Sequence, residues 1–277
     1  MRNRFSTSMI LGLAVAVVGA LWLAVSPLAG QGQAGIAGGF AAGVERIAGR
    51  PNMTGLWQSL NTANWNLQDH SAMAGPFYQL GAAGAVPPGQ GVVQGNDIPY
   101  LPAAATKKQE NYLNRLTLDP EINCYMPGIP RAMYMPHPFQ IVQSDQYILM
   151  AYSFASSNRI VHMNSTEEPP VDSWMGWSNG RWDGDALVID VTGLNGQAWF
   201  DRAGNFGTEN LHIVERLTMA GANHIDYQAT IEDPTVYSRP WTIRFPLYRR
   251  VEPGAQLLDF KCVEFSEEKL YGHLRKR

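Results

Sequence analysis

Short apolar stretches with alternating polar positions fill the chain from Pro138 onward. Clusters of turn-forming residues, such as SDQ, DGD, AGAN and EPGA, separate many of them. Closely spaced strands with turn signals between them are typical of an antiparallel barrel or sandwich, and they do not alternate with helices as a parallel α/β sheet requires. We therefore predict a mostly β chain with strands at FQIVQ, QYILMAYSF, NRIVHMN, SWMGWSNGRW, ALVIDVTGL, ENLHIVERLTM, HIDYQATIED, PWTIRFPLYRR and QLLDFKCVEF.

The N-terminal half is less regular. A first strand is predicted at PNMTGLWQ, and the Gly-, Pro- and Ala-rich residues 72–104 indicate an irregular excursion that packs on or covers something. One short helix is predicted at TKKQENYLNRL, because Thr106 and Gln109 have the spacing of a capping box. Prolines break the following DPEINCYMPGIPR into turns. The boundaries expected from these features are a tether at 31–50, one barrel domain at 51–265 with an insertion at 72–130, and a C-terminal tail at 266–277.

The chain begins with a segment typical of export. Two arginines precede the uncharged segment Met9–Val25, and small residues follow it, which is the form of a secretory signal. We expect a periplasmic or secreted protein, with residues 1–30 either cleaved or retained as an inner-membrane anchor through residues 9–25. In an exported protein an even pair of cysteines favours a disulfide, here Cys124 with Cys262, over two buried free thiols.

Charge and composition narrow the set of partners. The formal net charge is −3 at pH 7, so nucleic acid and anionic lipid surfaces are not expected partners, and a membrane is expected only through the N-terminal segment. The cysteines and histidines do not have the spacing of a metal site, and we expect no metal and no cofactor. Eight Trp, eleven Tyr and ten Phe suffice for an aromatic-lined pocket.

The segment GWSNGRWDGD begins with G-x-S-x-G, the spelling of a serine-hydrolase nucleophile elbow around Ser178. An elbow requires a helix after the serine. Here Asp183-Gly184 is instead a two-residue hairpin signal, and β-branched residues follow it. We interpret the segment as strand–turn–strand, in which a small face of Gly, Ser and Gly allows another strand or a ligand to approach closely.

The hairpin Glu209–Asp233, with a three-residue loop near Gly221, has one almost entirely apolar face. Glu215 interrupts that face, and a carboxylate there requires a partner. Arg159 is the expected partner, since it also lies in an apolar strand. Two interpretations are open: a structural buried ion pair, or a cavity carboxylate used for ligand binding or proton transfer.

Other residues are weaker candidates. His212 joins Glu215 and Arg159 as a candidate catalytic group, although a separation of three places it on the opposite face of a regular strand from Glu215. Asp201 lies in a polar, Gly-spaced loop, either as a catalytic residue or in solvated turn chemistry. The residues expected to bind the ligand are Trp177, Trp199, Tyr227, Trp241 and His162.

Two resemblances add to this picture. The motif Gly55-x-Trp57 on a first strand, followed by an antiparallel meander, resembles the lipocalin/calycin pattern. The chain also resembles a large, poorly characterised family of exported bacterial proteins, through motifs at Pro51–Trp57, Asp119–Arg131, Pro138–Gln143, Gly180–Gly193, Leu211–Arg216 and Asp233–Thr242. The resemblance implies an antiparallel calycin/lipocalin-like barrel but no mechanism. The segment YSFASSNRIVHMN departs from the family, with Ser and Asn where relatives are more aromatic and His-rich, so chemistry that rests on a His there is in doubt.

Taken together, these patterns favour an exported protein that binds a small, largely apolar molecule in the barrel cavity, with Arg159 and Glu215 fixing polar groups. One alternative is a cofactor-independent isomerase, lyase or hydrolase that uses a cavity carboxylate as acid or base. Another is a structural envelope protein with a filled barrel. A cavity would separate the first two from the third, and a cavity carboxylate with a raised pKa would favour the enzyme.

Overall fold

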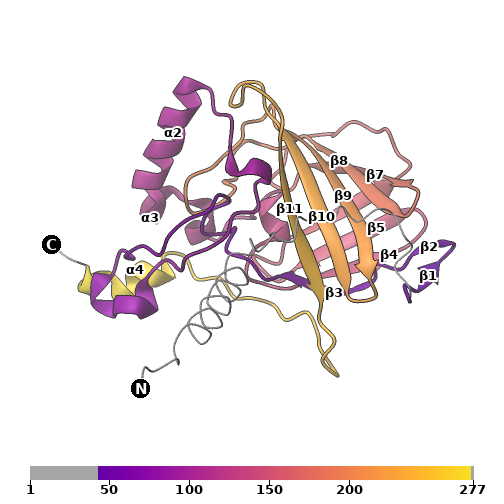
Figure 1. Ribbon diagram of the computed structural model, residues 1–277, viewed down its shortest axis with the longest axis horizontal. Helices are drawn as coiled ribbons and strands as arrows, with labels where there is room; N and C mark the ends of the chain where they lie inside the picture. Colours follow the sequence, from indigo (N-terminus) through magenta and orange to yellow (C-terminus); the bar gives the residue numbers. More distant parts are fainter. Residues whose placement is uncertain (1–42, 276–277) are drawn as a thin grey trace, which may run out of the picture. The chain divides into compact units, whose positions relative to one another are not determined.

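The structure is a computed structural model that describes residues 43–275. Nine strands close into a barrel in the order β10-β11-β3-β4-β5-β6-β7-β8-β9, and β9 pairs with β10 to complete it (Figure 1). The prediction of a mostly β, barrel-forming chain is confirmed. The strands are β3 (Gly55–Ser59), β4 (Phe139–Gln143), β5 (Tyr147–Tyr152), β6 (Asn158–Met163), β7 (Trp177–Asp183), β8 (Ala186–Thr192), β9 (His212–Gly221), β10 (His224–Glu232) and β11 (Trp241–Arg249).

One pair of neighbouring strands departs from the antiparallel pattern. Strands β6 and β7 run parallel, with Val161 opposite Ser178, and the predicted antiparallel direction is wrong for this pair. Parallel neighbours require a crossover connection rather than a tight turn, and residues 164–176 supply it. The alternation of side chains along a strand is the same in both directions, so the sequence pattern did not reveal this.

The G-x-S-x-G segment runs through strand β7 and then through a turn into β8, so the strand–turn–strand interpretation is confirmed. The turn residues are Gly184 and Asp185, one position later than predicted. Gly184, the first of the two, has the left-handed φ of 59° that glycine adopts most readily. A Cβ added to Gly180 would lie only 2.5 Å from Cγ1 of Val161 on β6. The group that approaches the small face is therefore a neighbouring strand.

The β9–β10 hairpin presents the predicted faces to the interior. Its turn has two residues, 222 and 223, rather than three, and a register shift between His224 and Ile225 follows the turn. Such a bulge adds a residue to one strand without reversing the faces beyond it. The inward row has no exposed surface and consists of Ile213, Glu215, Leu217, Ile225, Tyr227, Ala229 and Ile231.

The chain before β4 contributes further side chains to the interior. The short 3₁₀-helix η4 (Arg131–Met133) is buried, and so are its neighbours on both sides. The Met133 sulfur lies 3.3 Å from the phenol oxygen of Tyr152, and the Tyr134 ring packs edge-on against Phe245 with centroids 5.8 Å apart. These side chains give the barrel a packed core rather than a wide ligand cavity.

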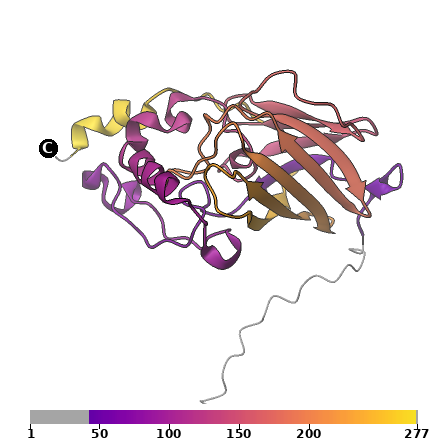
Figure 2. The ribbon, with the colours of Figure 1, turned by 90° about the horizontal axis from the view of Figure 1, so that it is seen from above.

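The helices α2, α3 and α4 lie at one end of the barrel, opposite the small hairpin of β1 (Arg46–Ile47) and β2 (Arg50–Pro51) (Figures 1 and 2). More helical segments are present than the one predicted. They are α2 (Pro102–Leu113), α3 (Arg115–Leu118), α4 (Ser266–Tyr271) and the 3₁₀-helices η1 (Tyr78–Gly84), η2 (Gln94–Asn96), η3 (Pro120–Asn123), η4 and η5 (Gly272–Leu274).

The predicted helix begins earlier than its expected cap. Helix α2 starts at Pro102, a residue suited to the first helical position, and Leu101 is its N-cap. Thr106 therefore lies inside the helix, where its hydroxyl donates to the Pro102 carbonyl at 3.3 Å. The capping-box prediction is wrong, although the helix itself is confirmed.

The predicted last strand, QLLDFKCVEF, is not a strand. Only Phe260 in it forms a β-bridge, with Phe154, because β11 already has neighbours on both sides in β10 and β3. The segment leads into α4, which lies within the expected tail. The expected signal or anchor falls outside the described residues. Among residues 43–275, no helix has the length and apolarity needed to cross a membrane.

Candidate functional site

The expected partners Glu215 and Arg159 meet inside the barrel. The Arg159 guanidinium donates through Nη1 to Glu215 Oε2 at 2.6 Å and through Nη2 to Oε1 at 3.1 Å. Their side chains are 0% and 2% exposed. The Tyr227 hydroxyl donates to Glu215 Oε1 at 2.7 Å, and the sulfur of Met150 lies 3.2 Å from Arg159 Nη2. The pairing predicted from the interrupted apolar face is confirmed.

This arrangement holds Arg159 as a cation and Tyr227 as a neutral phenol. Burial raises the pKa of Tyr227 well above its usual value, and the Glu215 carboxylate raises it further. Burial alone would lower the pKa of Arg159, but Glu215 outweighs it and the pKa is raised. Burial also raises the pKa of Tyr152, beside the pair, to about 12. A neutral phenol and a permanent cation fit the structural interpretation of the pair.

Ser178 lies beside this pair rather than at a reactive turn. Its hydroxyl is buried and lies 3.5 Å from Arg159 Nη1, at the limit of a hydrogen bond. Strand β7 continues through the serine without a following helix, so no helix N-terminus can stabilise an oxyanion there.

Three of the predicted site residues lie on the outer face of the barrel. His212 contacts Asp190 at 3.1 Å and Glu232 at 3.6 Å across neighbouring strands, so it cannot share a site with Glu215. His162 stacks on Trp177 with ring centroids 4.2 Å apart, also outside. His162 and Trp177 cannot line the barrel interior, because the residues next to each of them in sequence point inward.

Among the other predicted residues, Trp199 and Asp201 lie in the connection between β8 and β9, and Trp241 begins β11. Asp201 is fully buried and accepts hydrogen bonds from the backbone amides of Leu67, Ala203 and Asn205 and from the Asn205 side chain. Burial raises its pKa, and the solvated-turn interpretation is wrong. Trp199 forms an isolated antiparallel β-bridge with Phe206. The buried Trp241 packs on Phe200 and Tyr237. Of the predicted ligand-binding residues, Tyr227 and Trp241 face the interior, where other side chains surround them.

A second buried charge cluster shares no residue with the Arg159–Glu215 pair and was not predicted as a unit. Arg131 donates to Asp119 at 2.8 Å and to Glu121 at 2.6 Å, and Arg202 donates to Glu121 at 2.7 Å. The Asn64 amide also bonds Glu121. Burial alone would raise the pKa of Glu121, but Arg131 and Arg202 outweigh it and lower the pKa to about 2. The prolines of DPEINCYMPGIPR indicated only turns, and the partner Arg202 lies 81 residues from Glu121.

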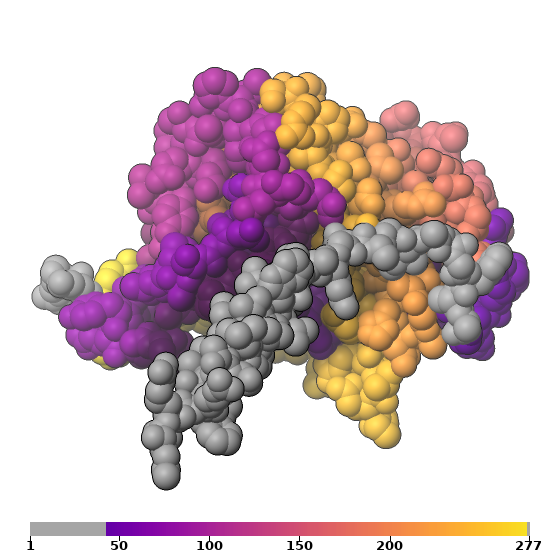
Figure 3. All heavy atoms as spheres, viewed as in Figure 1, coloured from indigo at the N-terminus to yellow at the C-terminus, as the bar shows by residue number. Residues whose placement is uncertain are grey.

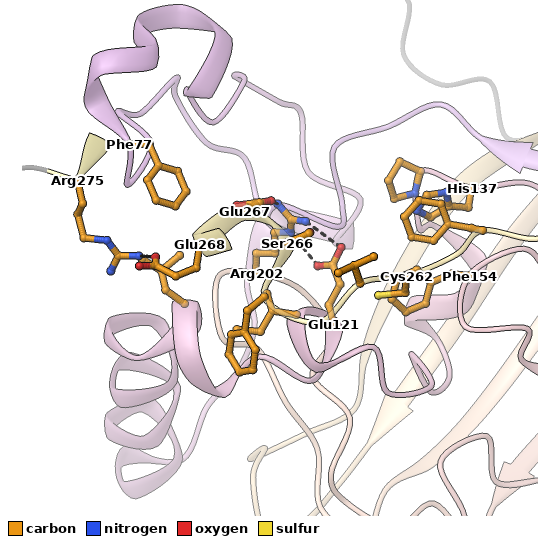
Figure 4. Close-up of a pocket in the computed structure, with 16 residues that line it drawn as sticks. Phe77, Glu121, His137, Phe154, Arg202, Cys262, Ser266, Glu267, Glu268 and Arg275 are labelled. Atoms are coloured by element: carbon orange, nitrogen blue, oxygen red, sulfur yellow. Dashed lines mark hydrogen bonds and ion pairs between the residues drawn. The ribbon is translucent and has the colours of Figure 1, made fainter. Parts of the chain in front are cut away.

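The predicted disulfide between Cys124 and Cys262 is confirmed, and it fixes the C-terminal segment beside this cluster. A cavity of about 210 Å³ lies here, with Glu121, His137, Arg202 and Glu267 in its wall (Figure 4). His137 stacks on the Phe154 ring, with centroids 5.7 Å apart, and contacts the tilted Phe260 ring at 4.2 Å. Partial burial lowers its pKa. The imidazole is therefore neutral near pH 7.

A larger cavity of about 640 Å³ shares part of that wall. It lies between the excursion, the helices α2 and α3, and the C-terminal helix α4. In Figure 3 the excursion and helices, indigo to magenta, form a continuous surface beside the orange barrel strands. The apolar wall of the larger cavity includes Trp65, Met73, Phe77, Leu80, Val86, Tyr112, Leu116, Ile122 and Tyr271. Its polar wall includes Lys108, Arg115, Asp119, Arg202 and Glu267. Of these residues, Lys108, Tyr112, Arg115 and Leu116 lie in the segment predicted as a helix, and Met73, Phe77, Leu80 and Val86 lie in the predicted excursion.

The described residues thus define a closed, mostly antiparallel β-barrel with a cavity beside it. No family model and no curated protein sequence matches the chain. Among solved structures it is similar to a variant of the fluorescent protein UnaG, at 10% identity and a TM-score of 0.31, over 72% of this chain and 97% of that one. The resemblance to an exported bacterial family stays a prediction.

Proposed function

We propose that this protein binds a small, largely apolar molecule in the cavity beside the barrel. The cavity of about 640 Å³, with its mostly apolar and aromatic wall, carries the proposal. Cavities of this size and lining are typical of small-molecule sites. The proposed site therefore moves from the barrel interior, which side chains fill, to the place where the excursion meets the helices.

The excursion supplies one wall of this cavity in an ordered form. Met73 and Val86 exchange two backbone hydrogen bonds, of 3.1 and 2.9 Å, and His70 and Gly89 do the same at 3.0 and 2.9 Å. Phe77 lies in the loop that the Met73–Val86 pair closes, and it is buried. Long segments that pack on a compact domain are often binding elements, and here the backbone pairing holds the wall in place.

The charges around the cavities support binding rather than catalysis. A general base that works near pH 7 needs a pKa near that value. Glu121 has a pKa of about 2 instead, and Arg131 and Arg202 occupy its oxygens. Asp119 is likewise held by Arg131. These carboxylates stabilise the wall, so the enzyme alternative has less support.

A neutral fluorescent probe tests the proposal. N-phenyl-1-naphthylamine fluoresces when it enters an apolar site, and we expect saturable binding to the protein. Ala83→Trp places a large ring at an exposed wall position and should abolish binding by filling the cavity. Ala82→Trp changes the neighbouring exposed residue, which is not part of the wall, and should leave binding intact. If the two variants bind the probe equally well, the cavity is not the site.

We also propose that the protein works outside the cytoplasm. The Cys124–Cys262 disulfide supports this, because disulfides persist in oxidising compartments. Cell fractionation of the full chain beside a chain without residues 1–30 tests it. We expect the full chain in the periplasm, the medium or the membrane fraction and the shortened chain in the cytoplasm. Cytoplasmic location of both would contradict the proposal.

A further inference from the structure

We propose that the cavity selects an amphiphilic anion, a molecule with an apolar body and one acidic group, and that Lys108 and Arg115 bind the acidic group. This inference rests on the proposed function and adds a ligand class to it. Its basis is the distribution of charge in the cavity wall.

The two cations lie on the helical segment that borders the cavity. Lys108 and Tyr112 are four residues apart in α2, which places them on one side of that helix. Arg115 begins α3, just after the non-helical Asn114. The Tyr112 ring lies between them: the Lys108 ammonium is 6.0 Å and the Arg115 guanidinium carbon 4.2 Å from its centroid. Both cations are half-buried, whereas the neighbouring Lys107 is exposed.

The other charged side chains of the wall have oppositely charged partners within the protein. Arg202 pairs with Glu121 and Glu267, and the buried Asp119 pairs with Arg131. Among the described residues, Lys108 and Arg115 have no carboxylate partner; Arg115 donates only to the Tyr112 carbonyl, at 2.8 Å. The wall therefore carries two cations that have no carboxylate partner of their own among the described residues.

An anionic group on an otherwise apolar ligand would complete this arrangement. Half-buried cations next to apolar side chains attract an anion more strongly than cations in open water do. The contact of Arg115 with the Tyr112 ring and carbonyl holds the guanidinium in one position, which favours a directed contact with an acidic group. The apolar body would then lie against the apolar wall, which includes Trp65, Phe77 and Leu116.

Two probes of nearly identical shape separate the contribution of charge from that of the apolar wall. 1-Anilinonaphthalene-8-sulfonate has the ring system of N-phenyl-1-naphthylamine and one added sulfonate. We expect the protein to bind the sulfonate probe more tightly than the neutral one. Lys108→Gln and Arg115→Gln should each weaken sulfonate binding roughly five- to tenfold, with neutral binding within about twofold of the unchanged protein. Lys107→Gln is the matched control and should change neither.

The results test selection of an anion separately from binding of an apolar molecule in the cavity. If the neutral probe binds in the cavity but the sulfonate does not bind more tightly, the anion inference is wrong and the proposed function stands. Equal effects of Lys107→Gln and Lys108→Gln would also overturn it, because they would mean general attraction to a basic surface. If neither probe binds, both proposals fail. Circular dichroism melting of each variant confirms that it is folded, and sulfonate binding should weaken with added salt more than neutral binding does.

Discussion

Arg159 of β6 and Glu215 of β9 join two strands that are not neighbours, through a bidentate contact inside the barrel. Val161 of β6 pairs with β7, which pairs with β8, which pairs with β9, so the ion pair spans the interior rather than linking neighbours. Removing either partner would leave a charge buried without compensation.

The first prediction concerns this pair. Arg159→Met and Glu215→Leu should each lower the free energy of unfolding by about 3–5 kcal/mol, and the double variant should recover much of that loss. Urea denaturation measures all three. The matched control is Arg216→Met. Arg216 follows Glu215 in sequence, points outward and pairs with Asp183 at the surface, so its loss should lower the free energy of unfolding by less than about 1 kcal/mol. The double variant should still bind the neutral probe, since the pair lies in the barrel; loss of binding by a folded double variant would place the site there instead.

The second prediction concerns Ser178. Ser178→Ala should leave probe binding unchanged, and fluorophosphonates should not label the protein, because the hydroxyl is buried in a continuing strand. Intact-mass spectrometry after treatment with the reagent measures this. Stoichiometric labelling at Ser178 would be incompatible with the strand–turn–strand geometry.

The third prediction concerns the disulfide. Its cysteines are 138 residues apart in sequence, so in the chain-entropy model the bond stabilises the fold by about 4–5 kcal/mol. The variant with both Cys124→Ser and Cys262→Ser should unfold at a correspondingly lower urea concentration. Addition of a reductant should shift the unchanged protein to the same midpoint and leave the variant unaffected. A reductant effect on the variant would mean that the stability change has another origin.

The fourth prediction concerns pH. The pKa of Glu121 is lowered from 4.5 to about 2 in the folded protein, because Arg131 and Arg202 outweigh its burial. A carboxylate with a depressed folded pKa stabilises the fold fully above the unfolded pKa and loses that contribution as pH falls. Stability on the order of 3 kcal/mol should therefore disappear between about pH 5 and pH 2.

Urea denaturation across that pH range, with Glu121→Gln for comparison, measures this contribution. The variant should be less stable at pH 7 and should lose less on acidification than the unchanged protein. Glu168→Gln, at an exposed position in the β6–β7 connection, is the control and should follow the unchanged protein. Parallel curves for Glu121→Gln and the unchanged protein would show that Glu121 does not carry the effect.

The barrel could be predicted because its strands alternate so regularly. In β9, inward positions such as Ile213 and Leu217 alternate with outward ones such as Arg216, and Glu215 stood out only because it broke that rule. The direction of β7 relative to β6 could not be predicted, since alternation describes faces and not neighbours. The start of α2 was missed because Pro102 was not recognised as a first helical residue.

The cavity beside the barrel was harder to predict for a different reason. Its wall combines Trp65, Phe77, Lys108 and Tyr271, which lie far apart in sequence and in segments without strong periodicity. The long excursion indicated that something was covered there, but not what. The Glu121–Arg202 contact likewise joins η3 to a loop 81 residues later in the chain, a separation that no local pattern bridges.

Strand β3 has a consequence for the integrity of the whole sheet. It pairs with β11 on one side and with β4 on the other, and it comes from the chain before Phe139, separated from β4 by the excursion and helices. A chain that began after Ser59 would keep the other strands of the barrel but lose the one that closes it. The outer backbone groups of β4 and β11 would then be free to pair with another molecule, and unprotected edges of this kind promote aggregation or strand exchange. The short strand with Gly55 and Trp57 therefore keeps this protein from presenting an open edge to its own copies.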